Sequence, residues 1–222
     1  MRLLVTDCFA DPSLRNEELA MEVTTRRRWT IGSTALSAVI AGLLGTQQAA
    51  DAAPAARHGG HMVQRTPDVG IDPNAPVITR EDIVIKAPLS RIWQIQTDID
   101  NWPSWQPGVV SATVQTPGCL RVGSVFHWLV EGLDVTSTVK QIRPLRRIVW
   151  GGPGNGITAT HVWTFTPGPD GIHVHTEESW AGAPVDANVE YAQAALDASL
   201  DAWVHNLKKA AEQPAVRKAK GH

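Results

Sequence analysis

The stretch IVIKAPLSRIWQIQTDIDNWPSWQP, from Ile83 to Pro107, is the part of the chain that decides the fold. It begins with alternating apolar residues, a pattern typical of a strand, and this run breaks at Pro88. The apolar residues of 89–95 then recur at helical spacing, and Trp102 and Trp105 follow in a proline-bracketed turn. The stretch therefore predicts a strand, a helix and a tryptophan-rich turn that together close one end of a sheet.

The sequence around this stretch predicts a sheet that ends in one long helix. Short alternating apolar runs, separated by glycine and proline, predict seven strands at 77–87, 109–116, 123–130, 133–143, 148–151, 157–166 and 172–180. The glycine-rich residues 151–156 lack the Lys-Ser/Thr of a phosphate-binding loop and predict a plain connecting loop. From 186 to 211 the apolar residues follow a helical period, with Asp186 as the expected N-cap and Pro214 beyond the end.

These elements predict an α+β domain in which a curved, seven-stranded antiparallel sheet wraps around the long C-terminal helix. Two short helices should follow the first strand. The helix of 89–95 is expected at the outer end of the sheet, opposite the C-terminal helix. A cavity between the sheet and the C-terminal helix would be lined by every second residue of each strand.

Composition narrows the class of function. The chain has 222 residues, a formal net charge of −2 and 43% hydrophobic residues, which argues against nucleic-acid binding and for a globular core. Nine Trp stand against one Tyr and three Phe, and such large rings suit either the walls of a cavity or a densely packed core. Both interpretations stay open at this point. No metal-ligand spacing and no nucleotide-binding motif occurs in the sequence, so we predict neither a metal nor a cofactor.

The first quarter of the chain predicts an export signal. The sequence TRRRWTI at 25–31 precedes a short apolar segment and a run of small residues, and its paired arginines resemble a twin-arginine signal. A membrane anchor is the alternative, but the apolar run is short and rich in glycine. We predict an over-extended start at 1–20 with Met21 as the true start, a signal peptide at 21–52, a flexible linker at 53–76, the domain at 77–213 and a basic tail at 214–222. The protein would then act in the periplasm, in the cell envelope or outside the cell.

Five segments of the domain resemble the START-like, or SRPBCC, superfamily, and within it the polyketide cyclase/dehydrase and lipid-transport branch. They are IVIKAPLSRIWQIQTDIDNWPSWQPGV at 83–109, VGSVFHW at 122–128, STVKQIRPLRRIVW at 137–150, HVWTFTP at 161–167 and HVHTEESWAG at 173–182. The resemblance covers about 77–212 and implies the helix-grip fold. It does not imply one function, because this superfamily includes carriers, cyclases and sensors.

The apolar parity of the strands selects the residues that should face the cavity. On neighbouring strands it places His161 and Glu178 on the inner face, where a hairpin about residues 167–171 would bring them together. The pair is either a general acid/base, with His161 oriented by Glu178, or a structural ion pair. The expected ligand-binding residues are Trp102, Trp105, Phe126, Trp128, Ser137, Trp163, Phe165, Trp180, Leu196, Leu200 and Trp203. Trp102 and Trp105 are expected near the mouth, where they either cap the core or meet the ligand.

Three functions remain open from the sequence. The first is an exported protein that binds a small hydrophobic or amphipathic ligand, with no nucleic-acid partner and no membrane span in the mature chain. The second is a cyclase or dehydratase that uses His161 with Glu178. The third is a structural envelope protein whose cavity is filled by its own tryptophan side chains.

Overall fold

The computed structural model describes residues 67–214. The predicted start, signal peptide and basic tail, and the linker up to residue 66, lie outside the described residues. The last part of the predicted linker lies along the sheet, where Val69 and Asp72 donate backbone hydrogen bonds to Gln141 and Ser179. Arg147 holds the same segment through a 2.8 Å hydrogen bond from its Nη2 to the carbonyl oxygen of Val69.

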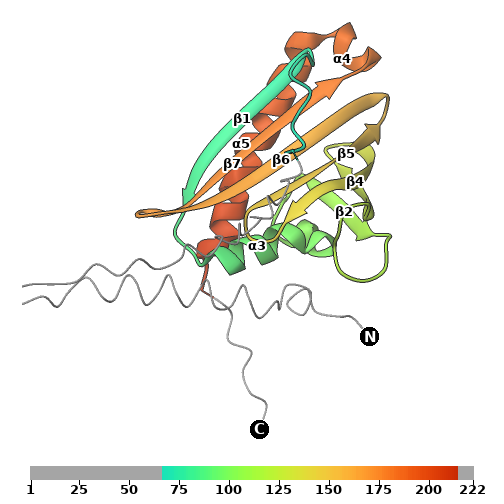
Figure 1. The fold of residues 1–222 in the computed structure, drawn as a ribbon. Helices are drawn as coiled ribbons and strands as arrows, with labels where there is room; N and C mark the ends of the chain where they lie inside the picture. Colours follow the sequence, from blue (N-terminus) through green and yellow to red (C-terminus); the bar gives the residue numbers. More distant parts are fainter. Residues whose placement is uncertain (1–66, 215–222) are drawn as a thin grey trace, which may run out of the picture. The chain divides into compact units, whose positions relative to one another are not determined.

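Seven antiparallel strands form one sheet in the order β1-β7-β6-β5-β4-β3-β2, and this confirms the predicted sheet (Figure 1). In this order every strand after β1 lies beside its sequence neighbour, and β7 returns to pair with β1. The strands are β1 (Val77–Ile85), β2 (Val109–Val114), β3 (Val125–Val130), β4 (Leu133–Arg143), β5 (Arg147–Gly154), β6 (Ile157–Gly168) and β7 (Gly171–Ala181).

The glycine-rich segment is part of a strand, so the prediction of a loop over 151–156 was wrong for its first four residues. Residues 151–154 belong to β5 and pair with β6. A Cβ atom on Gly151 would lie 2.2 Å from the carbonyl oxygen of Ala159, and one on Gly152 would lie 2.1 Å from that of Thr136. The glycines are therefore needed because neighbouring backbones approach closely here.

Four helical segments accompany the sheet: α3 (Leu89–Thr97), the 3-10 helix η2 (Ile99–Ser104), α4 (Ala183–Ala187) and α5 (Val189–Glu212). The short helices after β1 and the long C-terminal helix agree with the prediction. The predicted N-cap at Asp186 was wrong, because Asp186 lies in α4 and α5 begins after Asn188. The side chain of Asn188 accepts a hydrogen bond from the Tyr191 backbone N–H at 3.0 Å and so caps α5.

The sequence predicts that the first helix lies opposite the C-terminal helix. Instead, α3 packs against the last turns of α5. Arg91 of α3 donates to the carbonyl oxygens of Ala210 and Gln213, at 3.2 and 2.6 Å. These are carbonyl groups at the end of α5, which lack partners within the helix. The contact therefore stabilises the end of α5 and fixes α3 beside it. Within residues 67–214, no helix combines the length and the apolar character that a membrane crossing requires.

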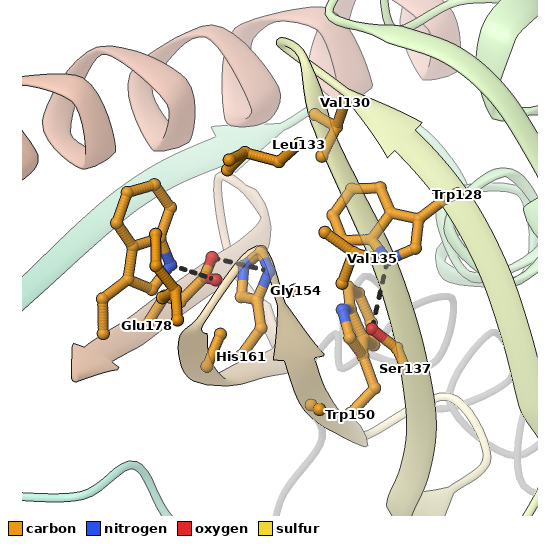
Figure 2. A pocket seen from close by; sticks show the side chains of 14 residues that line it. Trp128, Val130, Leu133, Val135, Ser137, Trp150, Gly154, His161 and Glu178 are labelled. Carbon is orange, nitrogen blue, oxygen red and sulfur yellow. Dashed lines mark hydrogen bonds and ion pairs between the residues drawn. The ribbon is translucent and has the colours of Figure 1, made fainter. Parts of the chain in front are cut away.

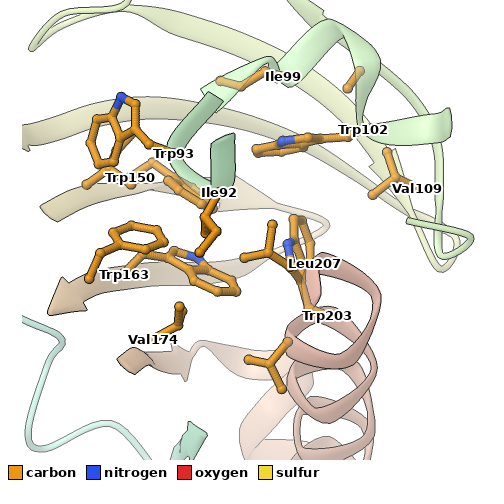
Figure 3. Close-up of a cluster of buried hydrophobic side chains, with 14 of the residues drawn as sticks. Ile92, Trp93, Ile99, Trp102, Val109, Trp150, Trp163, Val174, Trp203 and Leu207 are labelled. Carbon is orange, nitrogen blue, oxygen red and sulfur yellow. The ribbon is translucent and has the colours of Figure 1, made fainter. Parts of the chain in front are cut away.

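The core is dominated by aromatic rings (Figure 3). Trp102 of η2 is fully buried, and its ring centroid lies 5.2–5.5 Å from those of four other rings, namely Phe126, Trp128, Trp150 and Trp203. Its Nε1 donates to the carbonyl oxygen of Gln96 at 3.0 Å. The tryptophan-rich turn of the opening stretch thus fills the space between the sheet and α5.

Candidate ligand cavity

A small cavity lies on the inner face of the sheet, with a volume of about 40 Å³ (Figure 2). Its walls come from five consecutive strands, β3 to β7. They are Trp128, Val130, Leu133, Val135, Ser137, Trp150, Gly151, Gly152, Gly154, Ile157, Ala159, His161, Glu178 and Trp180. The volume exceeds that of a single water site and has room for a small end group of a larger molecule.

The structure divides the expected ligand-binding residues into two sets. Three of them line the cavity: Trp128, Ser137 and Trp180. The other eight do not line it and belong to the packing around it. Trp102, Trp105, Phe126, Trp163, Phe165 and Trp203 pack in the aromatic core, whereas Leu196 and Leu200 pack in a second cluster with Val77 and Val185.

His161 and Glu178 lie directly opposite each other on β6 and β7, as the strand parity predicted. The Nδ1 atom of His161 lies 3.0 Å from Oε2 of Glu178, with no hydrogen bond between them. Both side chains are buried and both line the cavity. That His161 and Glu178 act as a general acid/base stays a prediction.

The hydrogen bonds of the pair determine where the protons lie. Thr176 donates its hydroxyl proton to the carbonyl oxygen of Val162 at 2.9 Å, so its oxygen accepts from Nε2–H of His161 at 2.8 Å. Nε2 therefore carries a proton, and Nδ1 faces the carboxyl group of Glu178. The Oε1 atom of Glu178 accepts from Nε1 of Trp180 at 2.7 Å.

Burial shifts both pKa values toward the neutral forms. Desolvation lowers the pKa of His161 to about 3 and raises the pKa of Glu178 to about 7. Between these values the pair is neutral, with the imidazole uncharged and the carboxyl group protonated. This state suits the Nε2–H tautomer, because Nδ1 then carries no proton and faces an uncharged carboxyl group.

A second carboxyl group adds negative charge near the cavity. Glu131 lies at the exposed turn between β3 and β4, where partial burial raises the pKa of its carboxyl group and a hydrogen bond with Ser199 lowers it less strongly. Its charge contributes to the raised pKa of Glu178. No Lys or Arg is among the residues that line the cavity.

Sequence reasoning missed two features of the cavity wall. Trp150 lines the cavity from β5, next to His161, with ring centroids 4.9 Å apart. Ile148, Val149 and Trp150 are consecutive apolar residues and all are buried, so alternation alone does not show which of them face the cavity. The glycines of β5 also line the cavity, but their composition had indicated a loop.

Comparison with known proteins places this fold in a family. The family model described as "Polyketide cyclase / dehydrase and lipid transport" matches residues 76–212, which is most of the chain. The chain belongs to this family. A search of proteins with curated functions found no match.

Solved structures share the fold at low sequence identity. A hypothetical protein from Helicobacter pylori has a TM-score of 0.56 and 17% identity, over 66% of this chain and 98% of that one. The Zhui aromatase/cyclase from Streptomyces sp. R1128 has a TM-score of 0.55 and 15% identity, over 65% and 98% of the two chains. A START superfamily protein from Mycobacterium smegmatis has a TM-score of 0.51 and 15% identity, over 61% and 97%. At these identities the likeness concerns the fold alone.

Proposed function

We propose that this domain binds a small hydrophobic or amphipathic molecule, with one end of the ligand in the cavity that strands β3 to β7 line. The observation that carries the proposal is a cavity with mostly apolar walls and a buried, titratable His161–Glu178 pair. Apolar walls with a few fixed polar groups are the usual composition of small-molecule sites. Membership in a family named for cyclisation and lipid transport supports the same class of ligand.

The charges around the cavity restrict the ligand further. Burial raises the pKa of Glu178 and Glu131, and a bound anion would raise the pKa of each still more. Because no Lys or Arg lines the cavity, a carboxylate or phosphate would enter without a partner of opposite charge. The ligand group inside the cavity is therefore not an anion.

Filling the cavity tests ligand binding. Ala159→Leu adds apolar volume to the inner wall and is expected to weaken the binding of hydrophobic ligands at least about tenfold, because the added carbons occupy the ligand's place. Titration calorimetry with a ligand that co-purifies from the native host, identified by native mass spectrometry, measures the change.

The neighbouring residue on the same strand provides the control. Thr158→Leu places the same side chain on the exposed, outer face of β6 and should leave the affinity within about twofold. Unchanged affinity in Ala159→Leu would show that the ligand binds elsewhere, and equal loss in both variants would show a general effect on the fold. If neither the native host nor a set of hydrophobic probes yields any binding, the cavity is filled by its own tryptophans and the protein is structural.

The competing function is an enzyme that uses His161 as general acid/base, and the geometry favours this function less than ligand binding. Both ring nitrogens of His161 already face protein groups, Thr176 and Glu178, so a substrate would have to displace one of them. If such an enzyme cyclises or dehydrates a bound ligand, His161→Ala should lower turnover by about 10²–10⁴-fold while ligand binding persists. Turnover that is unchanged in this variant would exclude His161 as the catalytic group.

The place of action is a separate part of the proposal. We propose export through the twin-arginine route, on the strength of the arginine pair and the small-residue run in residues 25–56. A fusion of residues 1–56 to a reporter that is active only after export tests this proposal. Export that persists after Arg26 and Arg27 are both replaced by lysine would contradict the assigned route.

A further inference from the structure

Trp150 carries a hydrogen-bond donor that the protein itself leaves unused. The side chain is 1% exposed, lines the cavity, and has no hydrogen-bond partner for its Nε1–H. The two other tryptophans in the cavity wall both have acceptors. Nε1 of Trp128 donates to Ser137 at 3.1 Å, and Nε1 of Trp180 donates to Glu178 at 2.7 Å. A buried indole N–H without an acceptor destabilises the folded state, so Trp150 calls for an explanation.

The polar atoms around Trp150 are already engaged with other groups. The hydroxyl oxygen of Ser137 accepts from Trp128, and the two ring nitrogens of His161 face Thr176 and Glu178. Figure 2 shows the ring nitrogen of Trp150 on the side of the ring toward His161, beside the cavity. The acceptor for this donor must therefore come from what enters the cavity.

We propose that the Nε1–H of Trp150 anchors a neutral oxygen acceptor, such as a carbonyl oxygen, at the buried end of the bound ligand. This inference rests on the proposed ligand binding and names the group that the cavity selects. A hydrocarbon end would leave the donor unpaired, and a carboxylate end would face the carboxyl group of Glu178. A carbonyl group meets neither penalty and is small enough for the available volume.

The anchor also gives the ligand an orientation. The carbonyl oxygen would lie in the cavity beside Nε1 of Trp150, and the hydroxyl of Ser137 has its own proton to donate on the same wall. The apolar body of the ligand would extend along Val130, Leu133 and Ile157. Trp150 acts here as a positioning residue for specificity, independently of whether any reaction follows.

Two probes that differ in a single group test this anchor. Acetophenone and α-methylstyrene have the same arrangement of heavy atoms, and the first has a C=O where the second has a C=CH2. We expect the unmodified protein to bind acetophenone about tenfold more tightly, because only the ketone satisfies the indole N–H. Titration calorimetry gives the two affinities, and ¹H–¹⁵N spectra follow the indole signals.

The variant W150F removes the donor and keeps an aromatic ring. Its affinity for α-methylstyrene should change less than about threefold, and the advantage of acetophenone should fall to about twofold or less. W163F is the matched control, since the Nε1–H of Trp163 is also buried and unpartnered but the residue does not line the cavity. This control should retain the tenfold preference.

The spectra provide a readout that does not depend on the stability of a variant. In the unmodified protein, both probes should shift the indole N–H signal that is absent from W150F, and acetophenone should move its proton further downfield, as a hydrogen bond does. Equal binding of both probes, or a preference that W150F retains, would overturn the anchor and leave ligand binding intact. Binding of neither probe would overturn the anchor together with the proposed function.

Discussion

Replacing Trp102 with alanine is expected to lower the free energy of unfolding by about 3–5 kcal/mol. Trp102 is 0% exposed and contacts four other aromatic rings from β3, β5 and α5. Its removal would leave a cavity at the centre of the core, because rings held on separate strands and a helix collapse only partly into the space. The carbonyl oxygen of Gln96 would also lose the hydrogen bond that Nε1 of Trp102 donates.

Urea denaturation followed by circular dichroism measures this loss without depending on tryptophan fluorescence. Tyr191→Ala on α5 is the control, because Tyr191 is 73% exposed and its removal should change the free energy of unfolding by less than about 0.5 kcal/mol. Trp105→Ala should have an intermediate effect, since Trp105 is partly buried and contacts the edge of the same cluster. A loss below about 1 kcal/mol for Trp102→Ala would show that the core repacks freely.

The central position of Trp102 explains why the opening stretch decides the fold. The break at Pro88 ends β1 and lets α3 begin, and η2 then carries Trp102 into the space between the sheet and α5. Strand periodicity was sufficient to predict which residues face inward, because side chains alternate strictly along a strand. For the same reason the opposition of His161 and Glu178 could be predicted from two strands and the turn between them.

The features that sequence reasoning missed depend on contacts between distant segments. The glycines of β5 indicate a loop by composition, and only the backbone positions of Thr136 and Ala159 show why a strand needs them. The position of α3 beside α5 depends on Arg91 reaching the carbonyl groups at a helix end more than a hundred residues away in sequence. The cavity is smaller than alternation suggests, because the large rings of the core occupy most of the enclosed space.

The residues that line the cavity show the same limit of prediction from the sequence. Trp128, Ser137 and Trp180 were selected by parity alone, yet Trp163 and Phe165 have the same parity and pack in the core instead. Parity assigns a face of the sheet but does not show which part of that face is filled by other side chains of the core. The lining of the cavity therefore could not be predicted from alternation alone.

Glu178→Gln is expected to change the pH at which the buried pair begins to destabilise the folded protein in acid. This onset should move from about pH 4.5, the ordinary pKa of Glu, to about pH 6.5, the ordinary pKa of His. The raised pKa of Glu178 contributes stability that is present below pH 4.5 and is lost as the pH rises to about 7. The lowered pKa of His161 contributes stability that is present above pH 6.5 and is lost as the pH falls to about 3. Between 4.5 and 6.5 the folded pair and the unfolded chain each hold one proton, so the two effects cancel.

The E178Q variant loses this compensation, because only His161 still titrates and the unfolded chain takes up its proton first. Relative to the unmodified protein, its free energy of unfolding should fall by about 1.4 kcal/mol for each pH unit below 6.5. Urea denaturation of both proteins from pH 4.5 to 8 measures the difference. The surface His–Asp pairs are present in both proteins, so their contributions cancel. Glu177→Gln, on the opposite face of β7, is the matched control, because Glu177 lies away from the cavity and pairs with Arg80 at 3.2 Å. A difference for E178Q that does not vary with pH would show that burial does not raise the pKa of Glu178.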